Sequence, residues 1–214
     1  MRLAGPSSTV PAARTPRGQG DRLRERLLDA AVELVGEQGD TSRLSVRAVT
    51  RRAGVSPTAL YLHFDSHDEL LRALTERGFS EFREALRGAA GQGSEPAQRL
   101  LQAGRAYVRF AAEQPALYTV IFGPRTLTPQ AAGHPPSPKS QVGYESFDDL
   151  VVLIEGYLGP ARAARADTRA LARGIWSGLH GYVTLRRFRP LVEWGDEEQF
   201  VTALGEAWLG PPGD

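Results

Sequence analysis

Residues 46–64 read VRAVTRRAGVSPTALYLHF, and this stretch decides the fold of the N-terminal part of the chain. Two short apolar patterns lie on either side of an abrupt Ala-Gly-Val-Ser-Pro break. Gly54 can adopt the left-handed conformation that ends a helix, and Ser56 followed by Pro57 is a typical helix start. The stretch therefore predicts two helices joined by a turn of three or four residues, which is the helix-turn-helix pattern.

The two helices are predicted over residues 45–53 and 56–64, with Ser45 as the cap of the first. The residues expected to face the core are Val46, Val49, Ala53, Leu60 and Phe64. Those expected to face outward, or partly so, are Arg47, Arg51, Thr58, Ala59, Tyr61 and His63. Small side chains let a helix enter the major groove of DNA, while tyrosine and histidine can reach phosphates. The pattern favours DNA binding, with a three-helix bundle that binds nothing as the alternative.

Helical periodicity continues through the rest of the chain. Further helices are predicted over residues 22–36, 66–87, 95–113, 115–122, 144–158, 168–187 and 196–209. The apolar run VVLIEGYL, residues 151–158, is compatible with a helix or a strand. Residues 123–143 contain five prolines and are expected to form a mobile loop. The expected fold is all-α, with an N-terminal helix-turn-helix bundle and a larger C-terminal helical domain.

The composition narrows the class of protein. Of the 214 residues, 41% are hydrophobic, which is enough for real cores, and cysteine is absent. The missing cysteine excludes disulfides, cysteine nucleophiles and cysteine-bound zinc. The first residues lack the apolar segment of a secretory signal, and no run of about 18 apolar residues could span a membrane. A cytoplasmic protein is therefore expected.

Positive charge is concentrated in the N-terminal part. Residues 1–64 contain ten arginines and six acidic residues, whereas the whole chain has a net charge of only +1. This asymmetry indicates a polyanionic partner for one end of the molecule. Residues 1–20, rich in proline, glycine, serine and arginine, are expected to form a flexible basic arm. Residues 21–68 are then expected to form the DNA-binding domain, and residues 69–214 the larger C-terminal helical domain.

Two quoted segments carry a resemblance to a known family. They are LLDAAVELVGEQG, residues 27–39, and LSVRAVTRRAGVSPTALYLHFDSHDELL, residues 44–71. This part of the chain resembles the DNA-binding domain of TetR-type (tetracycline-repressor-like) transcriptional regulators. The resemblance implies a homodimer that binds double-stranded DNA at an inverted repeat. It also implies that the C-terminal helices dimerise and usually hold a small-molecule effector, so residues 69–214 would be the ligand-binding and dimerisation domain.

The same resemblance implies roles for individual residues. Ser45 and Arg47 would lie near the DNA backbone or groove. The residues that would enter the major groove are Ser56, Thr58 and Ala59, and those that would contact phosphates are Tyr61 and His63. The family often has a lysine at the position of His67 and a small residue or proline at that of Asp65. A phosphate contact there is therefore weakened, and Arg14 and Arg17 of the arm are expected to compensate by reaching the minor groove.

His63 and His67, with Asp65 and Asp68 nearby, also admit a metal-binding interpretation. Histidines four residues apart bind one metal ion from a continuous helix, whereas Asp65 and Ser66 indicate a helix break. No metal site and no cofactor are expected.

The stretch GIWSGLHGYVTLRR, residues 174–187, contains a Trp-His-Gly grouping that resembles a C-terminal domain type found in some TetR-type regulators. Trp176 and His180 lie on one helical face, which could line a pocket or form the dimer interface. The pocket hypothesis recruits Tyr107, Phe110, Phe122, Phe147, Trp176 and His180. For dimerisation we expect the helices over 168–187 and 196–209 to form a four-helix bundle with those of a second copy.

No enzyme signature is present, because the chain lacks G-x-S-x-G, H-E-x-x-H and P-loop motifs. The function predicted from the sequence is a DNA-binding repressor that an effector of unknown identity releases from its operator. One alternative is a helical small-molecule-binding or enzyme module without DNA binding. Another is an activator or an architectural DNA-binding protein.

Overall fold

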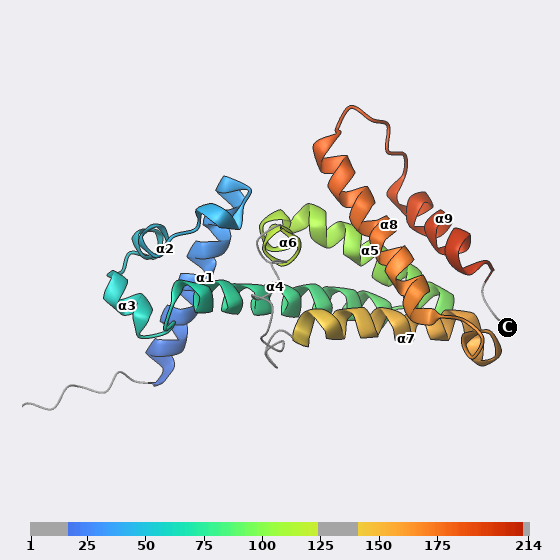
Figure 1. Cartoon of the computed structure of the whole chain (residues 1–214), viewed down its shortest axis with the longest axis horizontal. Helices are drawn as coiled ribbons and strands as arrows, with labels where there is room; N and C mark the ends of the chain where they lie inside the picture. Colours follow the sequence, from blue (N-terminus) through green and yellow to red (C-terminus); the bar gives the residue numbers. More distant parts are fainter. Residues whose placement is uncertain (1–16, 124–140, 212–214) are drawn as a thin grey trace, which may run out of the picture.

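The computed structural model describes residues 17–123 and 141–211, and within these ranges it contains helices and no strand (Figure 1). The elements are α1 (Arg17–Gln38), the 3-10 helix η1 (Thr41–Arg43), α2 (Val46–Ala53), α3 (Pro57–Tyr61), α4 (His67–Ala90), α5 (Pro96–Glu113), α6 (Pro115–Phe122), α7 (Gln141–Ala163), α8 (Thr168–Phe188) and α9 (Glu197–Leu209). The predicted all-α fold is confirmed, and residues 151–158 are helical.

Helices α1, α2 and α3 form a small bundle at one end of the molecule, and α4 runs from this bundle along the length of the larger body (Figure 1). Helix α4 contacts α1 in the bundle and α5, α6 and α7 in the body. Helices α8 and α9 pack against each other on the far side of α5 from α4 (Figure 1). Helix α4 therefore belongs to both the small bundle and the larger body.

Several boundaries differ from those predicted. Helix α1 begins at Arg17, so residues 17–20 of the expected arm are helical, and α4 continues to Ala90. Helix α3 ends at Tyr61, and the Leu60 carbonyl accepts hydrogen bonds from the N–H groups of both His63 and Phe64 in the turn that follows. Most of the expected arm, with Arg14, and residues 124–140 of the expected loop lie outside the described residues.

Helix α7 starts earlier and ends later than predicted. It begins at Gln141 rather than Tyr144 and continues past Leu158 through a kink. The kink lies at Gly159, whose φ of 71° is a conformation that glycine adopts at little cost, directly before Pro160. Among the described residues, no helix is long and apolar enough to cross a membrane.

The core of the small bundle is formed by large side chains with almost no exposed surface. They are Leu27, Leu28, Val35, Val49, Leu60, Phe64, Leu70 and Leu74. Each such side chain contributes about 1.5–3 kcal/mol when it is fully buried. These residues come from α1, α2, α4 and the segment around α3, so their packing fixes the helix-turn-helix on α1 and on the first turns of α4.

Two glycines allow α9 to approach α8 closely. A Cβ atom added at Gly174 would lie 2.5 Å from the Trp208 ring, and one added at Gly178 would lie 2.6 Å from Leu204 Cδ1. Neither position has room for a larger residue. Gly181, one turn further along α8, has nothing within 4 Å of its added Cβ.

Candidate nucleic-acid interface and internal cavity

The turn between α2 and α3 has the geometry expected of a helix-turn-helix. The Ser45 hydroxyl accepts a hydrogen bond from the Ala48 N–H (3.2 Å), and Gly54 is left-handed with φ 68° and ψ 36°. The Ser56 hydroxyl accepts from the Ala59 N–H (3.3 Å), and Pro57 occupies the first position of α3. The predicted caps and turn are confirmed, and they project the short helix α3 from the bundle.

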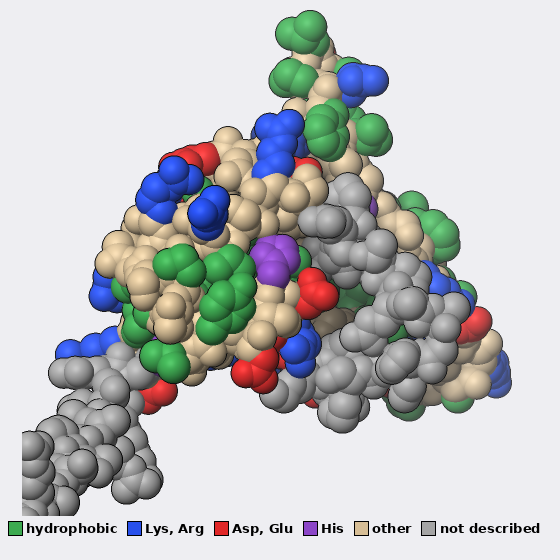
Figure 2. Space-filling model, turned by 60° about the vertical axis from the view of Figure 1, so that its left-hand side comes forward, with side chains coloured by type: hydrophobic (Ala, Val, Ile, Leu, Met, Phe, Trp, Pro, Cys, Tyr) green, Lys and Arg blue, Asp and Glu red, His purple; other side chains and the backbone are tan. Residues whose placement is uncertain are grey.

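The helix-turn-helix has a buried face and an exposed face, much as the spacing of its apolar residues predicts. Val49, Ala53, Leu60 and Phe64 are buried, while Val46 is half-buried rather than fully inward. The predicted DNA-contact residues that are exposed are Ser45, Arg47, Ser56, Thr58 and Tyr61, and the two that are half-buried are Ala59 and His63. Figure 2 looks onto this end of the molecule and shows basic and apolar side chains, with a histidine, gathered on it.

The arginines of α2 fall into two groups. The Arg52 guanidinium is bound by Glu37 (2.7 Å) and Glu33 (3.0 Å) of α1, and these hydrogen bonds raise its pKa. Arg47 and Arg51 are exposed and take part in no ion pair within the described part of the chain. They therefore leave uncompensated positive charge beside α3.

The His67 side chain binds the protein's own backbone and does not point outward. Its Nε2 atom lies 2.8 Å from the Leu44 carbonyl oxygen, which ties the start of α4 to the segment before α2. The Ser66 hydroxyl accepts from the Glu69 N–H, and the Glu69 carboxylate accepts from the Asp65 N–H (2.8 Å). These bonds form the break between α3 and α4 that separates His67 from His63. Among residues 17–123 and 141–211, no group of three or more potential metal ligands occurs.

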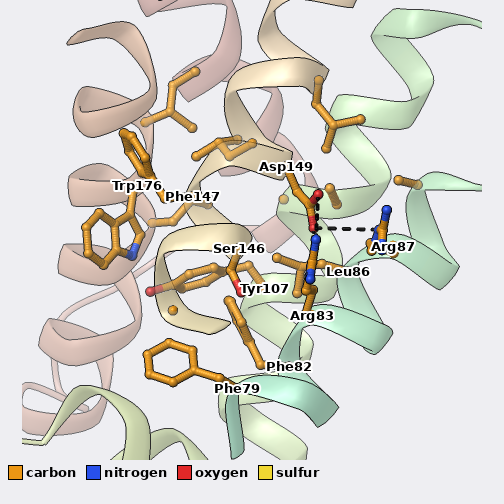
Figure 3. A pocket seen from close by; sticks show the side chains of 18 of the residues that line it. Phe79, Phe82, Arg83, Leu86, Arg87, Tyr107, Ser146, Phe147, Asp149 and Trp176 are labelled. Atoms are coloured by element: carbon orange, nitrogen blue, oxygen red, sulfur yellow. Dashed lines mark hydrogen bonds and ion pairs between the residues drawn. The ribbon is translucent and has the colours of Figure 1, made fainter. Parts of the chain in front are cut away.

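A cavity of about 1700 Å³ lies in the body. Four of the six residues predicted for a pocket line it, namely Tyr107, Phe122, Phe147 and Trp176. Figure 3 labels Tyr107, Phe147 and Trp176 among them. The sequence interpretation missed the α4 wall, which is formed by Phe79, Phe82, Arg83 and Leu86 (Figure 3). The apolar spacing of Phe79, Phe82 and Leu86 was the available signal, since it marks one face of a helix.

Phe110 and His180, the other two predicted residues, do not line the cavity. Phe110 is buried and packs edge-on against Phe82, with ring centroids 5.3 Å apart. His180 lies behind the wall, where its Nδ1 atom is 2.7 Å from the Tyr118 hydroxyl. The Tyr118 hydroxyl is in turn 3.0 Å from that of Tyr107. His180 therefore contacts the cavity wall from behind, through the two tyrosines and the ring of Phe122, whose centroid lies 5.4 Å from its own.

Burial keeps this His-Tyr-Tyr network uncharged near neutral pH. It lowers the pKa of His180 and raises the pKa of Tyr118 to about 12. The pKa of Tyr107 is also raised by burial. Because neutral His180 can accept at Nδ1, the Tyr118 hydroxyl can donate to it. The network joins α5, α6 and α8.

An ion cluster forms another part of the cavity wall and connects α4 to α7 (Figure 3). Arg83 donates to both carboxylate oxygens of Asp149, at 2.6 and 3.2 Å, and also pairs with Glu145. Arg87 lies 3.6 Å from Asp149. The hydrogen bond to Asp149 is the main cause of the raised pKa of Arg83. Two arginines and two acidic residues thus balance one another.

We expect His180→Gln to weaken the dependence of stability on acid pH. The folded protein holds the His180 proton less tightly than the unfolded chain, since burial lowers the pKa of His180 below its ordinary 6.5. Above pH 6.5, His180 is neutral in both the folded and the unfolded state and costs no stability. As the pH falls from 6.5 toward the lower pKa of the folded state, the unfolded chain binds the proton first, and the free energy of unfolding decreases. Melting temperatures measured from pH 7 to 5 should fall more for the unaltered protein than for the variant. Parallel curves would show that His180 is not responsible.

The fold and its exposed face define a helix-turn-helix DNA-binding protein with a large cavity in its helical body. The model of the family described as "Bacterial regulatory proteins, tetR family" matches residues 27–74. The one described as "Tetracyclin repressor-like, C-terminal domain" matches residues 100–207, about half of the chain. The chain therefore belongs to the TetR family and is a DNA-binding transcriptional regulator.

Individual proteins are similar to this chain in sequence or in fold. An uncharacterized HTH-type transcriptional regulator of Haemophilus influenzae is 35% identical over 71 residues, which are 33% of this chain and 35% of that protein. The chain thus matches about a third of the length of this relative. A protein of unknown function from Rhodococcus sp. RHA1 has a TM-score of 0.72 at 29% identity, covering 89% of this chain and 96% of that one. A TetR family transcription regulator from Marinobacter aquaeolei VT8 shares the fold, with a TM-score of 0.67 at 20% identity over 93% and 100% of the two chains.

Proposed function

We propose that this regulator is a homodimeric repressor that a small-molecule effector releases from an inverted-repeat operator. The observation that carries the proposal is the cavity, because α4 and α6 form part of its wall and also contact α1 of the DNA-binding bundle. A molecule bound in the cavity thus touches the helices that position α3. Residues 21–68 form the DNA-binding domain in this proposal, and residues 69–214 bind the effector and dimerise.

The DNA contacts follow the exposed face of the bundle. Thr58 and Ala59 enter the major groove, while Tyr61 and His63 reach phosphates. Arg47 supports this docking with its unpaired charge. Ser45 and Ser56 lie at the N-termini of α2 and α3, where their hydroxyls already cap the helices.

The exposed sides of α8 and α9 form the proposed dimer interface. On α8, Ser177, Gly181, Leu185 and Phe188 follow one another at helical spacing, and the last two are 51% and 65% exposed. On α9, the exposed apolar residues are Ala203, Ala207 and Trp208. Small residues permit close helix approach, and the large apolar ones need cover, so this surface suits a four-helix bundle around a two-fold axis.

Tight packing around α6 couples the cavity to the bundle. A Cβ atom added at Gly78 of α4 would lie 2.6 Å from Ile121 Cγ2 of α6, so these helices cannot shift independently at this point. Ala116 of α6 is in ordinary van der Waals contact with the position above Gly36 of α1, since a Cβ atom added there would lie 3.5 Å from Ala116 Cβ. A coupling free energy of about 1–3 kcal/mol across such contacts would lower operator affinity about 5- to 150-fold.

The cavity favours an uncharged effector with aromatic or other apolar rings. Its walls present the rings of Phe79, Phe82, Phe122, Phe147 and Trp176. Beside these rings, Tyr107 is neutral, and the ion cluster of Arg83, Arg87, Glu145 and Asp149 is balanced. Screening uncharged ring compounds for release of the protein from DNA tests this part. Compounds that bind in the cavity and leave DNA affinity unchanged would contradict it.

We expect Arg47→Ala to weaken binding to all DNA sequences alike and to flatten its dependence on salt. Each phosphate contact made by a cation contributes about −0.9 to the slope of the logarithm of the binding constant against the logarithm of the salt concentration. The slope of the variant should therefore be shallower by about 0.9 for each phosphate that Arg47 contacts. Arg165→Ala removes the same charge from the exposed surface of the body and serves as the control. Equal slopes for the two variants would contradict the proposed docking.

A further inference from the structure

Leu62 is an exposed apolar residue on the face that carries the DNA-reading side chains. It directly follows α3, and its backbone, with φ −74° and ψ −15°, continues the helical conformation. Leu62 therefore lies one turn after Thr58 and next to Tyr61 on the same side of the helix. Its side chain is 78% exposed, whereas Leu60 and Phe64, on the opposite side, are buried.

Single exposed leucines are common on protein surfaces, so exposure alone assigns no role to Leu62. Its surroundings are more specific, because the neighbouring α2 presents the unpaired cations Arg47 and Arg51 to a polyanion. A leucine side chain cannot hydrogen-bond to a phosphate or to a base edge. The apolar group that DNA offers in its major groove is the C5-methyl of thymine.

We propose that Leu62 selects a thymine in each half-site by packing against its C5-methyl group. The proposal rests on the docking of α3 in the major groove. Thr58 and Tyr61 then hold the helix in register with the bases and phosphates, and Leu62 rejects cytosine, whose ring lacks this methyl group. Leu62 is thus a specificity-determining residue in addition to those that hydrogen-bond.

The test uses a duplex selected from random DNA by the full-length protein. Each thymine of one half-site is replaced in turn by deoxyuridine, which removes the methyl group and leaves base pairing intact. At one position the affinity of the unaltered protein should fall about fourfold, the change that burial of one methyl-sized group supports. The Leu62→Ala variant should bind the thymine and deoxyuridine duplexes equally at that position, and Leu62→Met should still distinguish them.

The outcomes separate this inference from the proposed function. Equal loss on deoxyuridine substitution in the unaltered protein and in Leu62→Ala would overturn the inference, since another residue would then read the methyl group. Insensitivity at every thymine would overturn it as well. Failure of the selection to enrich any sequence would instead count against major-groove docking itself. Thermal melting of Leu62→Ala should match that of the unaltered protein, because the side chain is exposed.

Discussion

Replacing Leu185 and Phe188 together with glutamate is expected to turn the protein into a monomer and to weaken operator binding about 10²- to 10⁴-fold. Both side chains are exposed on α8 beside Gly181, which leaves open space for a second helix. Four glutamates facing one another across a two-fold axis would repel and would lose the apolar contact. A monomer binds one half-site, so it loses the gain from tethering two reading helices. Sedimentation and titration of an inverted-repeat duplex measure the two effects.

A control variant distinguishes loss of the interface from a general effect of added charge. Val152 is 65% exposed on α7, so Val152→Glu places one of these two charges on another helix and should leave the protein dimeric. A dimeric Leu185→Glu, Phe188→Glu protein would place the interface elsewhere. A monomeric variant with full operator affinity would contradict the homodimeric mode of binding.

Replacing Phe64 with alanine is expected to reduce the free energy of unfolding of the DNA-binding bundle by about 3–5 kcal/mol, the usual range for a buried phenylalanine. The Phe64 side chain is 1% exposed, and the Arg24 guanidinium lies over its ring, 5.4 Å from the centroid. The cavity left behind would remove the support beneath α3. Chemical denaturation followed by circular dichroism measures the change.

Leu62→Ala is the matched control for this prediction. It removes a large apolar side chain two residues away, yet one that is exposed, so the free energy of unfolding should change by no more than about 0.5 kcal/mol. If the two variants lose similar stability, the assignment of inner and outer faces around α3 is wrong.

The helix-turn-helix could be predicted almost completely from the sequence because its signals are local. Ser45, Gly54, Ser56 and Pro57 each act on backbone groups within a few residues, and the structure shows them doing so. The end of α3 was harder to predict, since residues 62–64 keep helical apolar spacing. The chain departs from α3 there because Phe64 turns into the core and Ser66 starts a new helix.

The cavity was predicted less completely because it depends on contacts between distant segments. Aromatic residues in α5, α6, α7 and α8 could be recognised, but their sequence does not show which of them face one another. Phe110 packs within the core, and His180 binds Tyr118 instead of facing the cavity. The α4 wall was missed because the apolar face of that helix is equally suited to core packing.

The most direct test of the account is the protection of DNA bases from methylation on a duplex selected by the protein. Dimethyl sulfate modifies guanine N7 in the major groove and adenine N3 in the minor groove, so it reports which groove the protein fills. Docking of α3 predicts two clusters of protected guanine N7 atoms whose centres lie about 34–36 Å apart, one turn of B-DNA. Protection confined to adenine N3, or one cluster without a second, would contradict it.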